Sequence, residues 1–308
     1  VAAAAMADAG IDYASLANTH AFDALTPGLE ETIESLDGAG ISHSGAGSNP
    51  DTAIAPAILD HDGVTVGYVS VTTTAGSQYD RDWAADETTT TYTVDRDGET
   101  LTVPDRAGVA DATPETIRAG VKAAAARADV VVTQIHGGEE YQQTPTPELQ
   151  NLTDTAIAAG SDLVVNHHPH VSGGLEMRDG ALVAWSMGNL FFDQNLWETY
   201  RSFVLQVTVT ADGVQSARAE PILIEGYAPR GVTGSLRDRL TWELAGLSDN
   251  SFAIIDDTLV YQPDGEQSTT QQLTLDGGVQ RRELGWITES GDSVQLCRER
   301  FVTGPFDD

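Results

Sequence analysis

The chain has 308 residues, of which 40% are hydrophobic and 20% are charged, so it can bury a full core and is not a disordered polymer. It carries 47 Asp and Glu residues against 16 Lys and Arg residues, a formal net charge of -31. This charge argues against nucleic acid and anionic membrane surfaces as partners. Because no apolar run approaches the roughly 18 to 20 residues that span a bilayer, no transmembrane segment is predicted.

The acidic residues are spread along the whole chain, and Lys122 is the single lysine. At about 1 M salt the Debye length falls to about 3 Å, and repulsion between surface carboxylates is largely screened. We therefore interpret the composition as halophilic. An ordinary acidic protein is the alternative, and it accounts less well for the near absence of lysine. The single cysteine, Cys297, excludes an internal disulfide framework.

The first third of the chain predicts short alternating elements. VAAAAMADAG is typical of the end of a helix, and IDYASLANTH of a strand that runs into a polar loop. Residues 26–40 predict a helix, and two strands joined at Asp62-Gly63 follow it. Residues 77–113 are polar and rich in Thr and Asp, and we interpret them as an insertion or loop region.

The middle of the chain alternates helix with strand. Helices are predicted over residues 113–128 and 147–160, and buried strands over residues 129–136 and 162–166. This alternation is typical of βαβ units in a largely parallel sheet. Antiparallel hairpins follow, with turns predicted at Asp179-Gly180 and Asp212-Gly213. From about residue 226 the pattern weakens to one helix and short strands.

Histidines gather where predicted strands end. Asn18 and His20 follow the first strand, His136 ends the strand over residues 129–136, and three more histidines follow the next strand: His167, His168 and His170. We expect these three strands to be parallel and in one sheet, because ligand sites of open α/β sheets lie at the carboxyl ends of strands. Neutral imidazole is a common ligand for Zn, Fe and Mn. The pattern therefore predicts a metal site.

Further polar residues flank the same strand ends. HGGEEY places Glu140 and Tyr141 just after His136, and SMGNLFFDQ places Asn189 and Asp193 after the strand ALVAW. A solvated acidic loop explains Glu140 about as well as a site does. His43 and His61 lie apart from the cluster, and we interpret them as ordinary hydrogen-bonded histidines.

Five stretches together resemble one family. They are SLANTHAFD, GLEETIESLDGAGISHSGAG, QIHGGEEYQQTPTPELQ, AAGSDLVVNHHPHVSGGLE and AWSMGNLFFDQ. In this order they resemble the CapA family of capsule and poly-γ-glutamate biosynthesis, within the calcineurin-like metallophosphoesterase superfamily. The resemblance implies a layered α/β/β/α metallophosphoesterase-like sandwich over residues 1–225. A helix and a mostly β extension are expected over residues 226–308.

The resemblance also implies roles for individual residues. The metal ligands would be Asn18, His136, His168 and His170, with His167 part of the family's double histidine. His20 would orient a phosphoryl group or protonate the leaving group, and Glu140 and Asp193 are the candidate catalytic carboxylates. Tyr141 and Asn189 are the candidate substrate-binding residues.

The chain departs from the superfamily at its start. The superfamily begins with a D-x-H strand and a G-D motif whose carboxylates bind and bridge two metals, and neither motif precedes Asn18. The resemblance thus implies an N-terminally incomplete domain, either truncated or degenerate, and a start inside the fold favours truncation. Two dications without a bridging anion repel strongly. We therefore expect one divalent transition metal, Mn, Fe or Zn, rather than two.

Three functions remain open from the sequence. The first is a CapA-like component of capsule or poly-γ-glutamate biosynthesis or export, and any activity would be metal-dependent phosphoric ester hydrolysis. The second is a general metal-dependent phosphoesterase, and the third a non-catalytic polymer-binding or scaffolding protein. The expected partners are an anionic polymer or a phosphorylated small molecule, together with other capsule-synthesis proteins. The resemblance favours an extracytoplasmic or cell-surface location.

Overall fold

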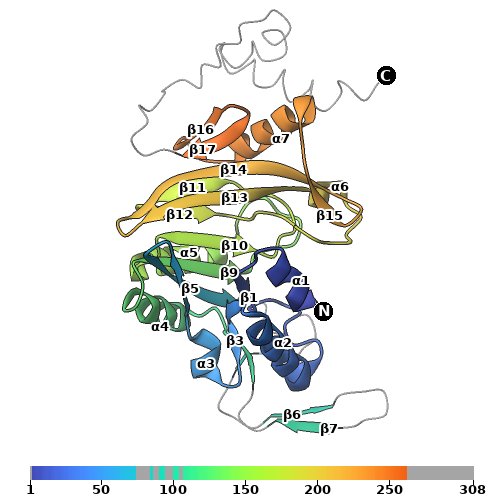
Figure 1. Cartoon of the computed structure of the whole chain (residues 1–308), viewed down its shortest axis with the longest axis vertical. Helices are drawn as coiled ribbons and strands as arrows, with labels where there is room; N and C mark the ends of the chain where they lie inside the picture. Colours follow the sequence, from blue (N-terminus) through green and yellow to red (C-terminus); the bar gives the residue numbers. More distant parts are fainter. Residues whose placement is uncertain (1, 74–83, 86–89, 94–99, 104–106, 262–308) are drawn as a thin grey trace, which may run out of the picture. The chain divides into compact units, whose positions relative to one another are not determined.

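The computed structural model describes residues 2–73, 84–85, 90–93, 100–103 and 107–261. They form a layered α/β sandwich with a β-rich C-terminal part, as predicted (Figure 1). In this part of the chain, no helix has the length and apolar character that crossing a membrane requires.

A six-stranded mixed sheet carries the histidines. Its four central strands are parallel, and hairpins add an antiparallel strand at each edge. Both hairpins turn at the predicted Asp-Gly pairs, Asp62-Gly63 and Asp179-Gly180. The strands, in spatial order, are β11 (Leu175–Arg178), β12 (Ala181–Ala184), β10 (Leu163–His167), β9 (Val130–His136), β5 (Val64–Thr72) and β4 (Ala57–His61).

Helices α4 (Pro114–Ala125) and α5 (Pro147–Ala159) cover one face of this sheet. Each begins close to its predicted start. In each, a threonine hydroxyl accepts a backbone N–H and a proline lies in the first turn. Side chains alternate along β9, so that Val131 and Ile135 pack against the helices while Val130 and Val132 face the other way. This alternation gives the sheet two buried faces.

A second sheet packs on the opposite face. Phe203, Ala217 and Ala219 share one hydrophobic cluster with Val130 and Val132 of the first sheet. The second sheet is antiparallel in the order β13-β14-β17-β16, and β15 also pairs with β14 (Figure 1). Its elements are β13 (Arg201–Thr210), β14 (Gly213–Glu225), β15 (Ala228–Gly231), β16 (Phe252–Ile255) and β17 (Thr258–Tyr261), with helices α6 (Trp197–Tyr200) and α7 (Gly234–Leu247).

The predicted division at residue 225 stays a prediction. Leu244 of α7, Phe252 of β16 and Leu259 of β17 belong to the same hydrophobic cluster as the sheets, so residues up to 261 share this core. The remainder of the predicted extension lies outside the described residues.

The prediction that the first strand shares a sheet with the other two site strands is wrong. β1 (Tyr13–Ser15) pairs in parallel with β2 (Ser42–Ser44) in a two-stranded sheet, while β9 and β10 are neighbours in the larger one. The short β1 still lies beside β5, since Tyr13 stacks on Tyr68 and the Ser15 hydroxyl hydrogen-bonds to that of Ser70. Helices α1 (Ala2–Asp8) and α2 (Leu25–Ala39) pack with β1 and with β3 (Ala46–Gly47) in a third hydrophobic cluster.

Part of the region predicted as an insertion or loop is regular. β6 (Thr90–Thr93) and β7 (Thr100–Val103) form an antiparallel hairpin, and β8 (Gly108–Val109) pairs with β3 (Ala46–Gly47). Residues 107–110 are buried, because their small side chains fit beside β3 and the short helix α3 (Pro50–Ile54). The other residues of 77–106 lie outside the described set, except Ala84 and Ala85.

Candidate metal site

Two neighbouring strands bring the central histidines together. β9 and β10 pair in a register that sets His136 opposite His167, at the carboxyl ends of both strands. The loops that follow are joined, because the Gly137 N–H donates to the His167 carbonyl and the Tyr141 N–H donates to the Pro169 carbonyl, each at 2.8 Å. The sequence predicted this convergence from the strand ends alone.

The backbone of these loops is strained. Tyr141, His168 and His170 have φ angles of 64°, 113° and 62°, in the left-handed region that side chains other than glycine rarely adopt. Each such residue costs on the order of 1 to 3 kcal/mol and persists only where its surroundings hold it. Strain at three residues of one loop pair is typical of a functional site.

A carboxylate and two imidazoles converge in these loops. Ligand atoms of Glu140, His168 and His170 lie within 4.8 Å of one another. A carboxylate with two imidazoles suits a divalent transition metal such as Mn, Fe or Zn. The set combines two residues predicted as ligands with one predicted as catalytic.

Hydrogen bonds fix the orientation of His170. Its Nδ1–H donates to Asn189 Oδ1 at 2.8 Å, and the Asn189 amide nitrogen donates to Gln194 Oε1 and to the Thr199 carbonyl. Because Asn189 Nδ2 is engaged twice, Oδ1 is left to accept from His170. The Nε2 lone pair of His170 is then free for a metal, which is how an outer hydrogen bond orients an imidazole ligand.

A chain of imidazoles lies behind His168. His168 Nδ1 is 3.1 Å from His136 Nε2, and His136 Nδ1 is 2.8 Å from His167 Nδ1. The Thr19 hydroxyl is also 3.2 Å from His136 Nε2. At the end of this chain, His167 Nε2 is buried without a hydrogen-bond partner among the described residues. Both His136 and His167 lie outside the three-residue cluster, and their role as ligands stays a prediction.

Burial keeps these imidazoles neutral. Burial, followed by the neighbouring histidines, holds the pKa of His136 far below its usual range. Burial likewise lowers the pKa of His167 to about 4, with His168 adding to the effect. The pKa of His168 is lowered mainly by burial, although nearby Glu140 opposes the shift. A metal ligand must be unprotonated, so the residues present fit a divalent metal.

The remaining predicted residues lie around this centre. Asn18 Oδ1 accepts the His20 N–H at 2.8 Å, within the loop after β1. His20 Nδ1 is 2.8 Å from Asp23 Oδ2, and both side chains are exposed. Asp193 is exposed on the loop after β12 and has no hydrogen-bond or ion-pair partner among the described residues. The roles predicted for Asn18, His20 and Asp193 stay predictions.

Sequence reasoning did not assign three residues that touch this centre. Thr19 contacts His136, the Phe192 ring lies 4.9 Å from the His170 ring, and Gln194 links Asn189 to the Tyr141 hydroxyl. Thr19 stands between Asn18 and His20, so its position could have suggested a role. Gln194 follows the same strand as Asn189 and Asp193, so its position near the site was predicted without a role. Phe192 carries no comparable signal, because its contact depends on how the loop after β12 folds.

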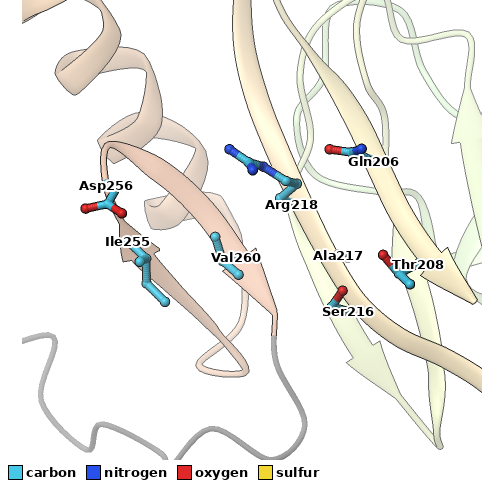
Figure 2. A pocket seen from close by; sticks show the side chains of 8 residues that line it. All are labelled: Gln206, Thr208, Ser216, Ala217, Arg218, Ile255, Asp256 and Val260. Atoms are coloured by element: carbon cyan, nitrogen blue, oxygen red, sulfur yellow. The ribbon is translucent and has the colours of Figure 1, made fainter.

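A separate hollow of about 420 Å³ lies on the five-stranded sheet, between β13–β14 and β16–β17 (Figure 2). Gln206, Arg218 and Asp256 are among the residues that line it. Arg218 hydrogen-bonds to Glu220, so its positive charge is already partnered. None of the predicted site residues lines this hollow.

The fold and the cluster together define a layered α/β sandwich with a carboxylate–histidine centre at the ends of parallel strands. The model of the family described as bacterial capsule synthesis protein PGA_cap matches residues 1–194, and the chain belongs to this family. The predicted resemblance to the CapA family is thereby confirmed.

Named relatives agree with this assignment. Capsule biosynthesis protein CapA of Bacillus anthracis is 26% identical over 238 residues, which cover 75% of this chain and 52% of that protein. PGA biosynthesis protein CapA of Bacillus subtilis strain 168 is 28% identical over 251 residues, 80% of this chain and 60% of that protein. The chain therefore spans only about half to three fifths of the relatives it matches.

Two further proteins are similar to this chain. A Mycobacterium tuberculosis protein named probable polyglutamine synthesis accessory protein is 28% identical over 207 residues, 64% of this chain and 50% of that protein. A hypothetical protein from Thermus thermophilus has a solved structure with a TM-score of 0.36 and 15% identity, covering 73% of this chain and 76% of that one. We draw nothing about the site from this last similarity.

Proposed function

We propose that this chain is a CapA-like component of capsule or poly-γ-glutamate biosynthesis or export, with a metallophosphoesterase-type site that holds one divalent transition metal. Family membership supports the biological process. The convergence of Glu140, His168 and His170 within 4.8 Å supports the metal, and the proposal depends on this observation most. The names of the Bacillus relatives favour a cell-surface or extracytoplasmic location.

Each residue of the site has a proposed task. Glu140, His168 and His170 hold the metal, and Asn189 keeps the His170 ring in the ligating orientation. A bound divalent ion would polarise a phosphoryl or carboxyl oxygen of the ligand. His20 accepts or delivers a proton, because Asp23 occupies its Nδ1 and leaves Nε2 for the ligand.

The ligand is an anionic polymer or a phosphorylated small molecule. With a net charge of -31, the chain itself repels anions at low salt, so the metal supplies the local positive charge that recognition requires. Salt near 1 M reduces the Debye length to about 3 Å and removes most of the repulsion.

A non-catalytic role is the second candidate. The cluster found among the described residues contains one carboxylate, that of Glu140, which we assign to a single metal. Hydrolysis by two metals needs a carboxylate that bridges the two ions. We therefore expect this chain to bind its ligand but to hydrolyse 4-nitrophenyl phosphate slowly or not at all.

Metal analysis after dialysis tests the proposed site. We expect about one Mn or Zn per chain in the wild type, and weaker retention in Glu140→Gln. The matched control is Glu139→Gln, since Glu139 is the exposed neighbour outside the cluster and its loss leaves retention unchanged. No retained metal, or equal retention in Glu140→Gln, contradicts the proposal. Rapid hydrolysis of 4-nitrophenyl phosphate contradicts the inference that a site with one carboxylate is a poor hydrolase.

A further inference from the structure

Exposed apolar side chains gather beside the candidate metal site. Ten large hydrophobic residues are exposed in the described part of the chain, and six of them are Tyr141, four residues of the loop after β12 and the first residue of α6. Phe191 is the most exposed, at 67%. We call these six residues the apolar rim: Tyr141, Leu190, Phe191, Phe192, Leu196 and Trp197.

The apolar rim touches a residue of the metal cluster. The Phe192 ring lies 4.9 Å from the His170 ring, and the Tyr141 ring stacks on the same imidazole at 6.3 Å. Any ligand held at His170 therefore lies within reach of two aromatic rings. This contact separates the rim from scattered surface residues such as Tyr227 and Ile255, which need no special explanation.

Two polar side chains anchor the loop that carries the rim. Asn189 is buried and bonds to His170, to Gln194 and to the Thr199 carbonyl, and Gln194 donates in turn to the Tyr141 hydroxyl. The apolar side chains between these anchors are left facing solvent. A surface loop normally has the opposite arrangement, so the exposed apolar face is a built feature of the site.

We propose that the ligand of this site is an amphiphilic anion. Its phosphate-type head would lie at the metal held by Glu140, His168 and His170, and its apolar or aromatic group would lie on the rim. This inference rests on the proposed function and adds the chemical class of the ligand. At high salt, interactions between charges are screened while apolar burial is strengthened. Apolar contact is therefore an attraction between chain and ligand that persists at high salt.

Two probes that share a head and differ in their apolar part test the inference. Calorimetric titration of the Mn-loaded protein in 2 M KCl compares phenylphosphonate with methylphosphonate. We expect phenylphosphonate to bind about 10-fold more tightly, from the burial of one aromatic ring. In the Phe191→Ser, Phe192→Ser double variant the ratio falls to about 2-fold, since both phenylalanine rings are gone and only Tyr141 remains beside His170. Tyr227→Ser is the matched control and keeps the wild-type ratio, because Tyr227 is an equally exposed aromatic residue outside the rim.

The single variant Phe191→Ser controls for a folding defect in the double variant. Phe191 is more exposed than Phe192, so its replacement leaves the melting temperature unchanged and still lowers the ratio. Equal binding of the two phosphonates by the wild type, or an unchanged ratio in both rim variants, overturns the inference. So does a rim that instead supports vesicle binding or self-association, measured as flotation with neutral lipid or as a rise in mass that the double variant loses.

Failure of the proposed function gives a different result. In that case methylphosphonate binding does not depend on Mn and is unchanged in Glu140→Gln. If binding depends on Mn and on Glu140 but shows no preference for the phenyl group, the metal site stands and the amphiphilic ligand is wrong.

Discussion

Two regions of the molecule hold polar groups in partly apolar surroundings: the ends of β9 and β10, and the outer part of the five-stranded sheet. The two regions differ in how far these polar groups find hydrogen-bond and ion-pair partners. In the sheet, Glu220 accepts hydrogen bonds from Arg218, Arg237 and Thr258. Burial alone would raise the pKa of Glu220, but the bonds from Arg237 and Arg218 outweigh burial and lower it. Every charge in this network has a partner.

The histidine region leaves polar groups unpaired. His167 Nε2 is buried without a partner among the described residues, and the backbone of His168 and His170 is strained. Within the described part of the chain, no basic side chain forms an ion pair with Glu140. Strain does not separate the two regions, because the turn between β16 and β17 also has positive φ angles, but the pairing of charged groups does. The sheet pairs its charges with one another, whereas the histidine region leaves an imidazole nitrogen and a carboxylate open, as ligation requires.

The largest expected effect acts on both regions alike. With 47 Asp and Glu against 16 Lys and Arg, added salt relieves repulsion across the whole surface and strengthens apolar burial. We expect the melting temperature to rise steeply between low salt and 2 M KCl, as calorimetry can measure. A flat or falling melting temperature would contradict the halophilic interpretation.

The second effect is confined to the histidine region. In a His168→Ala, His170→Ala double variant the affinity for Zn should fall more than about 100-fold, because even a residue that only orients a ligand is worth 10- to 100-fold. Competition with a fluorescent chelator measures it. His61→Ala is the control, since His61 bonds to Tyr68 far along the sheet. An equal loss of Zn affinity in His61→Ala would contradict the distinction between the two regions.

Acid should destabilise the protein through His167. Its pKa is about 4 when folded and 6.5 ordinarily, so between these values the unfolded chain binds more protons. The stability from neutral His167 is complete above about pH 6.5 and is lost as the pH falls toward 4, by on the order of 3 kcal/mol.

Urea unfolding of the metal-free protein in 2 M KCl measures this loss. His167→Gln cannot titrate, so its free energy of unfolding should fall less between pH 7 and pH 4 than that of the wild type. If the two proteins lose stability equally, His167 is not held neutral by burial.

The smallest effect belongs to the sheet. Arg237→Met should lower the free energy of unfolding by about 1 kcal/mol, because a partly exposed ion pair and its hydrogen bonds are worth little more. Zn affinity should stay within about 2-fold of the wild type. A larger change in Zn affinity would mean that the two regions are coupled.

Strand-end position was enough to predict much of this site from the sequence. The alternation of helix and strand placed His136 and His167 at the ends of parallel strands of one sheet, and Asp-Gly pairs located the hairpins. The partner of β1 could not be predicted, because three residues carry too little hydrophobic pattern to define a sheet. Sequence spacing also gave no means of separating Glu140, which joins the cluster, from His136, which lies behind it.

The central claim is that Glu140, His168 and His170 hold one metal ion, and anomalous diffraction from Zn-soaked crystals tests it most directly. We predict a single strong peak at about 2.0 to 2.2 Å from a carboxylate oxygen of Glu140 and from one ring nitrogen each of His168 and His170. No peak in this cluster, or the strongest peak at the exposed His20–Asp23 pair, would contradict the account.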